Sequence, residues 1–117
     1  MKIKTSELTG AALDWAVAQC EDIRIGHPGF WTKAVIRAAT DGTECPWPYS
    51  ISWAQGGPII EREQISIRQW ANVPIVHAYM PQDDAPWASD GTSPLIAAMR
   101  CYVASKLGDE VDVPEGL

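Results

Sequence analysis

The sequence predicts a small α+β domain in which about three helices pack on an antiparallel sheet of three to four strands, as a layered α/β sandwich. Two segments have the apolar spacing of helices, a central segment is rich in β-branched residues, and turn-forming residues separate them. The length of 117 residues suits one domain, so we expect a single domain over residues 1–117. Residues 109–117 form an acidic tail that either frays or adds a short edge strand at 111–113.

The first and last predicted helices have the clearest end signals. The first is expected from Thr9 to Glu21, with the Thr9 hydroxyl as its N-cap. Its buried stripe is Leu13, Ala16, Val17 and Cys20. The last helix has an apolar stripe of Leu95, Ile96, Met99, Val103 and Leu107. Its end signals are Thr92 or Ser93 as cap, Pro94 at the first helical position and Gly108 as the closing residue.

A further helix is expected in the middle of the chain, from Ser52 as cap to about Glu63. Glycines 56 and 57 weaken this prediction, and Pro58 fits best in a first turn or at a kink. The segment Thr32–Ala38 is predicted instead as a strand, because Val35 and Ile36 are β-branched and Asp41-Gly42 follows as a turn signal.

Two neighbouring strands are expected later in the chain. Ile65 to Trp70 alternates as a half-exposed strand does, and Val73 to Met80 is rich in β-forming residues. Asn72 and Pro74 mark the connection between them. The segment Pro81–Thr92 is expected to form turns around one short strand near position 87.

Six tryptophans in 117 residues are more than the core of a small domain comfortably holds. They are Trp15, Trp31, Trp47, Trp53, Trp70 and Trp87. We expect Trp15 and Trp53 in the core, and the others in a groove, at an interface or over the sheet. The two prolines in 44–50 exclude a helix there, so this segment is predicted as a stiff extended loop that presents Trp47 and Tyr49.

Residue patterns for catalysis and metal binding give negative results. Nucleotide-binding glycine loops and a G-x-S-x-G nucleophile elbow are absent from the sequence, and His27 and His77 are isolated. The adjacent Asp83 and Asp84 are interpreted as solvated loop acids. Three widely spaced cysteines without a C-x-x-C pair indicate reduced thiols, with Cys20 and Cys101 as core residues. We therefore predict no enzyme activity, no metal and no cofactor.

Charge and hydropathy limit the classes of partner. A net charge of −6 argues against direct binding to nucleic acid or to anionic lipid, because such binding depends on basic surfaces. Apolar runs of membrane-spanning length and a secretory signal are absent from the sequence, so we expect a cytoplasmic protein that does not contact a membrane.

Aromatic residues beside cations or hydroxyls support the hypothesis of a polar-aromatic pocket. In such a pocket the rings stack on a ligand and the arginines hold anionic groups. The candidate ligand-binding residues are Trp47, Tyr49, Arg62, Arg68 and Trp70. The alternative is that the tryptophans fill the core or a dimer seam, and that Glu61-Arg62-Glu63 is a solvated helix face. A protein-binding module would instead expose an apolar patch of tryptophans, and a DNA accessory would show a basic stripe.

Three segments carry a resemblance to a known family. They are Ser6–Cys20 with the pattern G-x-x-L-D-x-x-V-A, Tyr49–Glu63 with Y-S followed by W, and Ser93–Glu110 with P-L-x-A-x-x-R. Together these segments resemble NinX-type proteins of lambdoid and related tailed phages and prophages. The order of the motifs is also similar to a phage domain described as an α-β-α sandwich.

The resemblance implies an accessory protein that acts in the host cytoplasm, and it brings no catalytic residues. One expectation is a non-enzymatic binder that sequesters a nucleotide-like small molecule, such as a host defence signal, or that blocks a host protein. The alternative is an accessory to phage DNA recombination or replication that acts through protein–protein contacts. Assembly as a homo-oligomer is a further expectation, since closed symmetric assemblies are common.

Overall fold

The computed structural model describes residues 1–80 and 87–117, and the Asp83–Asp84 pair lies outside them. The described residues form an α+β fold, as predicted, with four α-helices, a 3₁₀ turn at Thr5–Glu7 and five strands. The helices are α1 (Gly10–Ile25), α2 (Thr32–Asp41), α3 (Trp53–Glu63) and α4 (Pro94–Leu107). The strands are β1 (Lys2–Lys4), β2 (Ser66–Gln69), β3 (Val76–Met80), β4 (Trp87–Gly91) and β5 (Glu110–Asp112).

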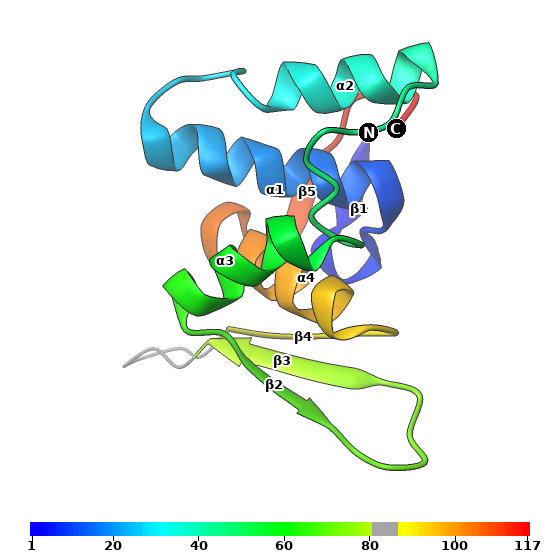
Figure 1. Ribbon diagram of the computed structural model, residues 1–117, viewed down its shortest axis with the longest axis vertical. Helices are drawn as coiled ribbons and strands as arrows, with labels where there is room; N and C mark the ends of the chain where they lie inside the picture. The colour runs from blue at the N-terminus through cyan, green and yellow to red at the C-terminus, as the bar shows by residue number, and fades with distance from the viewer. Residues whose placement is uncertain (81–86) are drawn as a thin grey trace.

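The elements are stacked in layers (Figure 1). Strands β2, β3 and β4 form an antiparallel sheet in that order, and α4 packs against all three. Helices α1 and α3 pack on α4, and α2 packs on α1. All four helices lie on one side of this sheet in Figure 1. None of the helices in the described part of the chain is long and apolar enough to span a membrane.

Helix α4 begins and ends as predicted. The Ser93 hydroxyl accepts a hydrogen bond from the backbone N–H of Ile96 at 3.2 Å, Pro94 follows at the first position, and the helix ends at Gly108. Helix α1 runs four residues beyond its predicted end at Glu21, to Ile25. The Thr9 side chain makes no capping hydrogen bond, so its predicted role is wrong. Thr9 does precede the helix in an extended conformation.

The prediction of a strand at 32–38 is wrong, because this segment belongs to α2. Thr32, Val35 and Ala38 recur at helical spacing and are buried, which a strand would not allow. The cap of this helix comes from a distant residue. The Asp22 carboxylate, near the end of α1, accepts hydrogen bonds from the N–H groups of Trp31 at 2.8 Å and Thr32 at 3.2 Å, and from the Thr32 hydroxyl at 2.8 Å. Gly42, which was interpreted as part of a turn after a strand, is the left-handed C-cap of α2.

Helix α3 spans the predicted range and continues through Pro58. Ser52 precedes it but its side chain makes no capping hydrogen bond. Gly56 allows a close approach to its neighbours, because a β-carbon there would lie 2.6 Å from Leu95 Cδ2 and 2.7 Å from the carbonyl oxygen of Tyr49. This glycine therefore sets how closely α3 packs on α4.

The predicted strand pair 65–70 and 73–80 is confirmed as β2 and β3. Asn72 has a left-handed backbone (φ 70°) in the connection, a conformation that asparagine adopts more readily than most residues. A second, two-stranded sheet pairs β1 with β5, with Ile3 opposite Val111. Residues 110–112 are thus a strand, one of the two expectations for the tail.

The core lies mainly between α1, α4 and the inner face of the sheet. Cys20 and Cys101 are buried in it, as predicted. Burial raises the pKa of the Cys20 thiol to about 12 and that of Cys101 to about 11, which keeps both thiols protonated and unreactive at neutral pH.

Candidate functional site

The β2–β3 hairpin carries two of the predicted site residues, Arg68 and Trp70. The guanidinium carbon of Arg68 lies 5.8 Å from the centre of the Trp70 ring, within the range of a cation–π contact. Trp70 is 49% exposed, and two more apolar side chains in the same turn, Val73 and Ile75, are 43% and 47% exposed. We call Trp70, Val73 and Ile75 the hairpin patch. Residues 69–74 line an open groove of about 530 Å³ at this turn.

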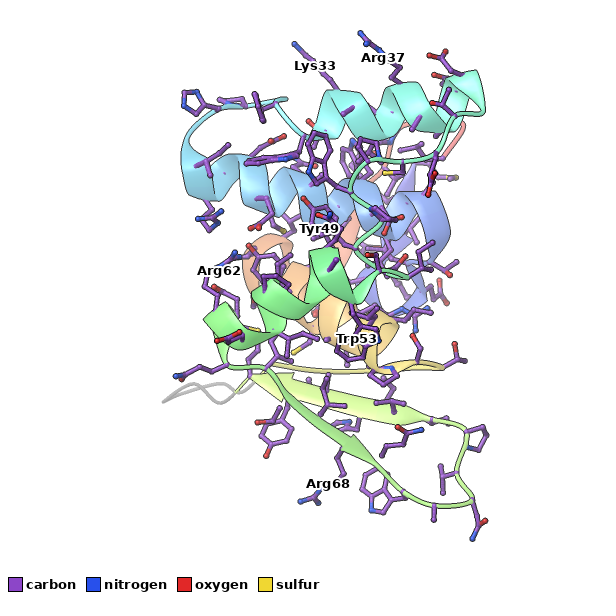
Figure 2. All side chains as sticks on the ribbon, viewed as in Figure 1. Lys33, Arg37, Tyr49, Trp53, Arg62 and Arg68 are labelled. Carbon is purple, nitrogen blue, oxygen red and sulfur yellow. The ribbon has the colours of Figure 1, made fainter. Side chains whose placement is uncertain are left out.

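The strand register continues a polar face beside the hairpin patch. Val76, Ala78 and Met80 of β3 are buried, so His77 and Tyr79 point to the opposite face. Arg68 is opposite His77 in the register, and His77 is opposite Asp90 of β4. His77 Nδ1 and Asp90 Oδ1 lie 2.7 Å apart, so this pair is satisfied within the protein. Figure 2 shows Arg68 projecting away from the helices.

Trp47 and Tyr49 lie elsewhere, in the loop before α3. Tyr49 is 4% exposed, so the prediction that the loop presents it is wrong, and Figure 2 shows it between α1 and α3. Trp47 is half-buried and packs edge-on against Trp31, with ring centres 5.8 Å apart. Both rings pack on the core, and the loop then ends in a turn in which the N–H groups of Ile51 and Ser52 donate to the carbonyl oxygen of Pro48.

Arg62 does bind anionic groups, but they belong to the same chain. Its Nη2 donates to Glu21 Oε2 at 2.8 Å and its Nη1 to Glu21 Oε1 at 3.2 Å, and the Glu21 side chain is 8% exposed. The Tyr102 hydroxyl donates to the same carboxylate at 2.8 Å, and Arg24 contacts it at 3.2 Å. Burial first, and then the Glu21 charge, raises the pKa of Tyr102, which stays neutral.

This cluster of Glu21, Arg62 and Tyr102 joins α1, α3 and α4. Arg62 also reaches Glu63 Oε2 at 3.0 Å, and Lys106 lies 3.7 Å from Glu63 Oε1. Residues 61 and 62 are exposed, as the interpretation of a solvated helix face expects, and the charge of Arg62 is in addition paired with the buried carboxylate of Glu21. Both oxygens of Glu21 are used in bonds that hold the helices together, so we assign the cluster a structural role.

The five predicted site residues therefore fall in three places: the hairpin, the loop before α3, and the α1–α3–α4 junction. Trp15 is buried as predicted, at 8% exposure, but Trp53 is 55% exposed. The expectation for Trp53 is wrong because α3 turns Gly56 and Ile59 toward the core and leaves the indole at its first position outside. Val73 and Ile75 were not predicted as site residues. The available signal was their place beside Asn72 and Pro74, because turn-forming residues indicate an exposed connection.

Asp14 is a buried acid in the G-x-x-L-D-x-x-V-A segment of α1. Its Oδ1 accepts a hydrogen bond from the backbone N–H of Ser50 at 2.9 Å, so it ties α1 to the loop before α3. Burial raises the pKa of Asp14, and its hydrogen bonding to Ser50 opposes this shift. The aspartate of the first motif and the Y-S of the second thus meet in the folded protein.

We expect Asp14→Asn to stabilise the protein by on the order of 1 kcal/mol at pH 7, because asparagine keeps an acceptor for Ser50 and removes a buried charge. The pKa of Asp14 is higher in the folded than in the unfolded state. The free energy of unfolding of the wild type therefore rises as the pH falls through the folded-state pKa toward about 4, because the folded protein takes up the proton first. The gain from Asp14→Asn should shrink over that range. Urea melts at pH 7 and pH 4 measure it.

The control for this experiment is Asp41→Asn, because Asp41 is exposed at the end of α2. It should change the free energy of unfolding little at either pH. A destabilised Asp14→Asn variant at pH 7 would contradict the account of Asp14.

Within residues 1–80 and 87–117, no group of three or more histidine, cysteine, aspartate or glutamate side chains is placed to hold a metal ion. The hairpin patch places three exposed apolar side chains in one turn, beside the arginine that stacks on Trp70. The fold and this surface describe a small α+β domain with an open candidate interface.

Residues 4–106 match the family model described as Bacteriophage P22, NinX. Because the match covers most of the chain, the protein belongs to the phage NinX family, as its three motifs indicated. No curated protein matches the chain.

Proposed function

We propose that this NinX-family protein is a non-enzymatic accessory protein that acts in the host cytoplasm by binding another protein through the hairpin patch. The observation that supports it is the exposure of Trp70, Val73 and Ile75 together in one turn, at 49%, 43% and 47%. Exposed apolar side chains clustered beside polar residues are typical of protein-binding surfaces, and tryptophan is a frequent source of binding energy there.

The charge beside the patch specifies the chemistry of the partner. Among the described residues, Arg68 forms no ion pair and contacts the Trp70 ring through its guanidinium. The neighbouring His77 is already paired with Asp90. The partner should therefore offer an apolar groove for Trp70 with an aspartate or glutamate at its edge for Arg68.

A second candidate is the binding of a nucleotide-like signal, favoured by the Arg68–Trp70 pair, since a ring and a guanidinium suit a base and a phosphate. The guanidinium already occupies a position over the ring, and the adjoining groove is open. A protein partner therefore fits this surface better. Thermal-shift measurements with mononucleotides and cyclic oligonucleotides test this candidate, which requires a shift that Arg68→Ala abolishes.

The protein-partner proposal is tested by photo-crosslinking. A photoreactive phenylalanine at position 73 should crosslink to one protein in phage-infected cells, which is then identified, purified and titrated with the unmodified chain. We expect Trp70→Ser to weaken that binding by about 30-fold or more, the loss typical of a central interface tryptophan. A phage DNA-handling protein as the partner would indicate a role in recombination or replication, and a host protein would indicate host inhibition.

Ile51→Ser is the matched control, because Ile51 is 77% exposed but lies in the loop before α3. It should leave the affinity unchanged. Equal binding by wild type and Trp70→Ser would overturn the proposal. A dimer of this chain that depends on Trp70, detected by light scattering, would identify a second copy as the occupant and would also overturn it.

A further inference from the structure

A cavity of about 440 Å³ lies between α1 and α2, away from the hairpin patch. Trp15, Gln19 and Ile23 line it from α1, where their spacing of four residues places them on one face. Ile36 of α2 and Pro28 of the connecting turn add further apolar wall. This volume is near the lower end for small-molecule sites, which suits one ring system.

Gln19 places an unused polar group in this apolar wall. Its Oε1 atom is buried and, within the described part of the chain, has no hydrogen-bond partner. A buried polar atom without a partner is costly, and such atoms are rare in folded proteins. The terminal torsion of a glutamine rotates broadly, so the carboxamide can turn its C=O and its NH₂ toward the cavity that it lines.

The charges around the cavity restrict what it accepts. None of its described lining residues is a lysine, arginine or histidine. Asp22 is the acid in the wall, and both of its oxygens are already used. Its Oδ1 accepts a hydrogen bond from Trp31, and its Oδ2 accepts two from Thr32. An anionic group therefore has no counter-charge in the wall, whereas an uncharged ring loses little on entering it.

We propose that this cavity is a binding site for an uncharged planar heteroaromatic ring whose edge carries an N–H donor beside an acceptor, as the aminopurine edge does. A carboxamide matches that edge with two hydrogen bonds, the pairing that glutamine makes with the amino group and N7 of adenine. The apolar side chains at 15, 23 and 36 surround the faces of the ring. This site is independent of the protein-binding function proposed for the hairpin patch.

The test is a titration of the full chain with adenine, adenosine and AMP, in which ligand-observed NMR detects binding. We expect adenine to bind, 7-deazaadenine to bind about tenfold more weakly because it lacks the N7 acceptor, and AMP to bind no more tightly than adenosine. Comparing the affinities of adenine, adenosine and AMP shows whether the cavity binds the purine ring best as a base, a nucleoside or a nucleotide.

Gln19→Met keeps the side-chain volume and removes the carboxamide. It should weaken adenine binding about tenfold and make adenine and 7-deazaadenine equivalent. It should also raise the Tm of the free protein, because it removes an unsatisfied buried atom. Gln55→Met, on α3 and outside the cavity, should change none of these values. A purine series that does not bind, adenine binding unaffected by Gln19→Met, or AMP bound tenfold more tightly than adenosine would overturn the proposal, while binding through the hairpin patch would be unaffected.

Discussion

Glu21→Gln is expected to lower the free energy of unfolding by about 3 kcal/mol, which corresponds to a fall in Tm of roughly 10 °C. The glutamine removes a buried charge that both nitrogens at the end of Arg62 contact, at 2.8 and 3.2 Å. Arg62 then keeps its charge in a partly buried position without its main partner. The Tyr102 hydroxyl loses its charged acceptor at the same time. Urea denaturation of the purified variant measures the loss.

Two further variants test the cause of this loss. Glu63→Gln removes a more peripheral carboxylate, whose side chain is 17% exposed, and should cost about 1 kcal/mol or less. Glu21→Leu combined with Arg62→Met removes both charges and should recover part of the stability lost in Glu21→Gln, because the guanidinium that loses its main partner is removed as well. If Glu21→Gln lowers the free energy of unfolding no more than Glu63→Gln does, the buried Glu21–Arg62 pair does not have the structural role assigned to it.

Gly56→Ala is expected to destabilise the protein by about 2 kcal/mol, although alanine is the better helix former. The added methyl group would lie 2.6 Å from Leu95 Cδ2 and 2.7 Å from the carbonyl oxygen of Tyr49. The leucine can adjust, but the carbonyl oxygen belongs to the backbone. Helix α3 must therefore move away from α4 and from the loop before it. Thermal and urea melts measure the effect.

Gly57→Ala is the matched control, in the same helix and one residue further on. Its new methyl group would lie 3.8 Å from the nearest atom, in the Trp53 ring, which is an ordinary contact. This variant should gain up to about 1 kcal/mol from helix propensity. Equal effects of the two substitutions would show that close packing at Gly56 does not limit the approach of α3.

Local signals made some of this fold predictable. The end signals of α4 were correct because Ser93, Pro94 and Gly108 act within the helix that they delimit. Helix α2 was missed because its cap, Asp22, is 10 residues upstream of Thr32 and belongs to another helix. The β-branched pair at 35–36 favoured a strand, although the alanines around it favour a helix.

In the candidate site, too, local features were predictable and contacts between distant residues were not. The alternation from Ile65 to Trp70 predicted a half-exposed strand, which is a local pattern, and Trp70 is exposed just after that strand. Arg62 was predicted to hold an anionic group of a ligand, whereas its guanidinium is paired with Glu21, which is 41 residues away in the sequence. Pairings over such distances depend on how helices pack, which spacing alone does not show. Gln19 had a weak signal, as a polar residue four positions from both Trp15 and Ile23.

The pairing of β1 with β5 affects how the chain folds during synthesis. Residues 2–4 leave the ribosome long before their partners, residues 110–112. The sheet β2–β3–β4 and the adjoining α4 involve contacts much closer in sequence, and local contacts form sooner. The N-terminal strand therefore waits unpaired while the rest of the domain is made, and the two-stranded sheet closes only after residues 110–112 have cleared the ribosome.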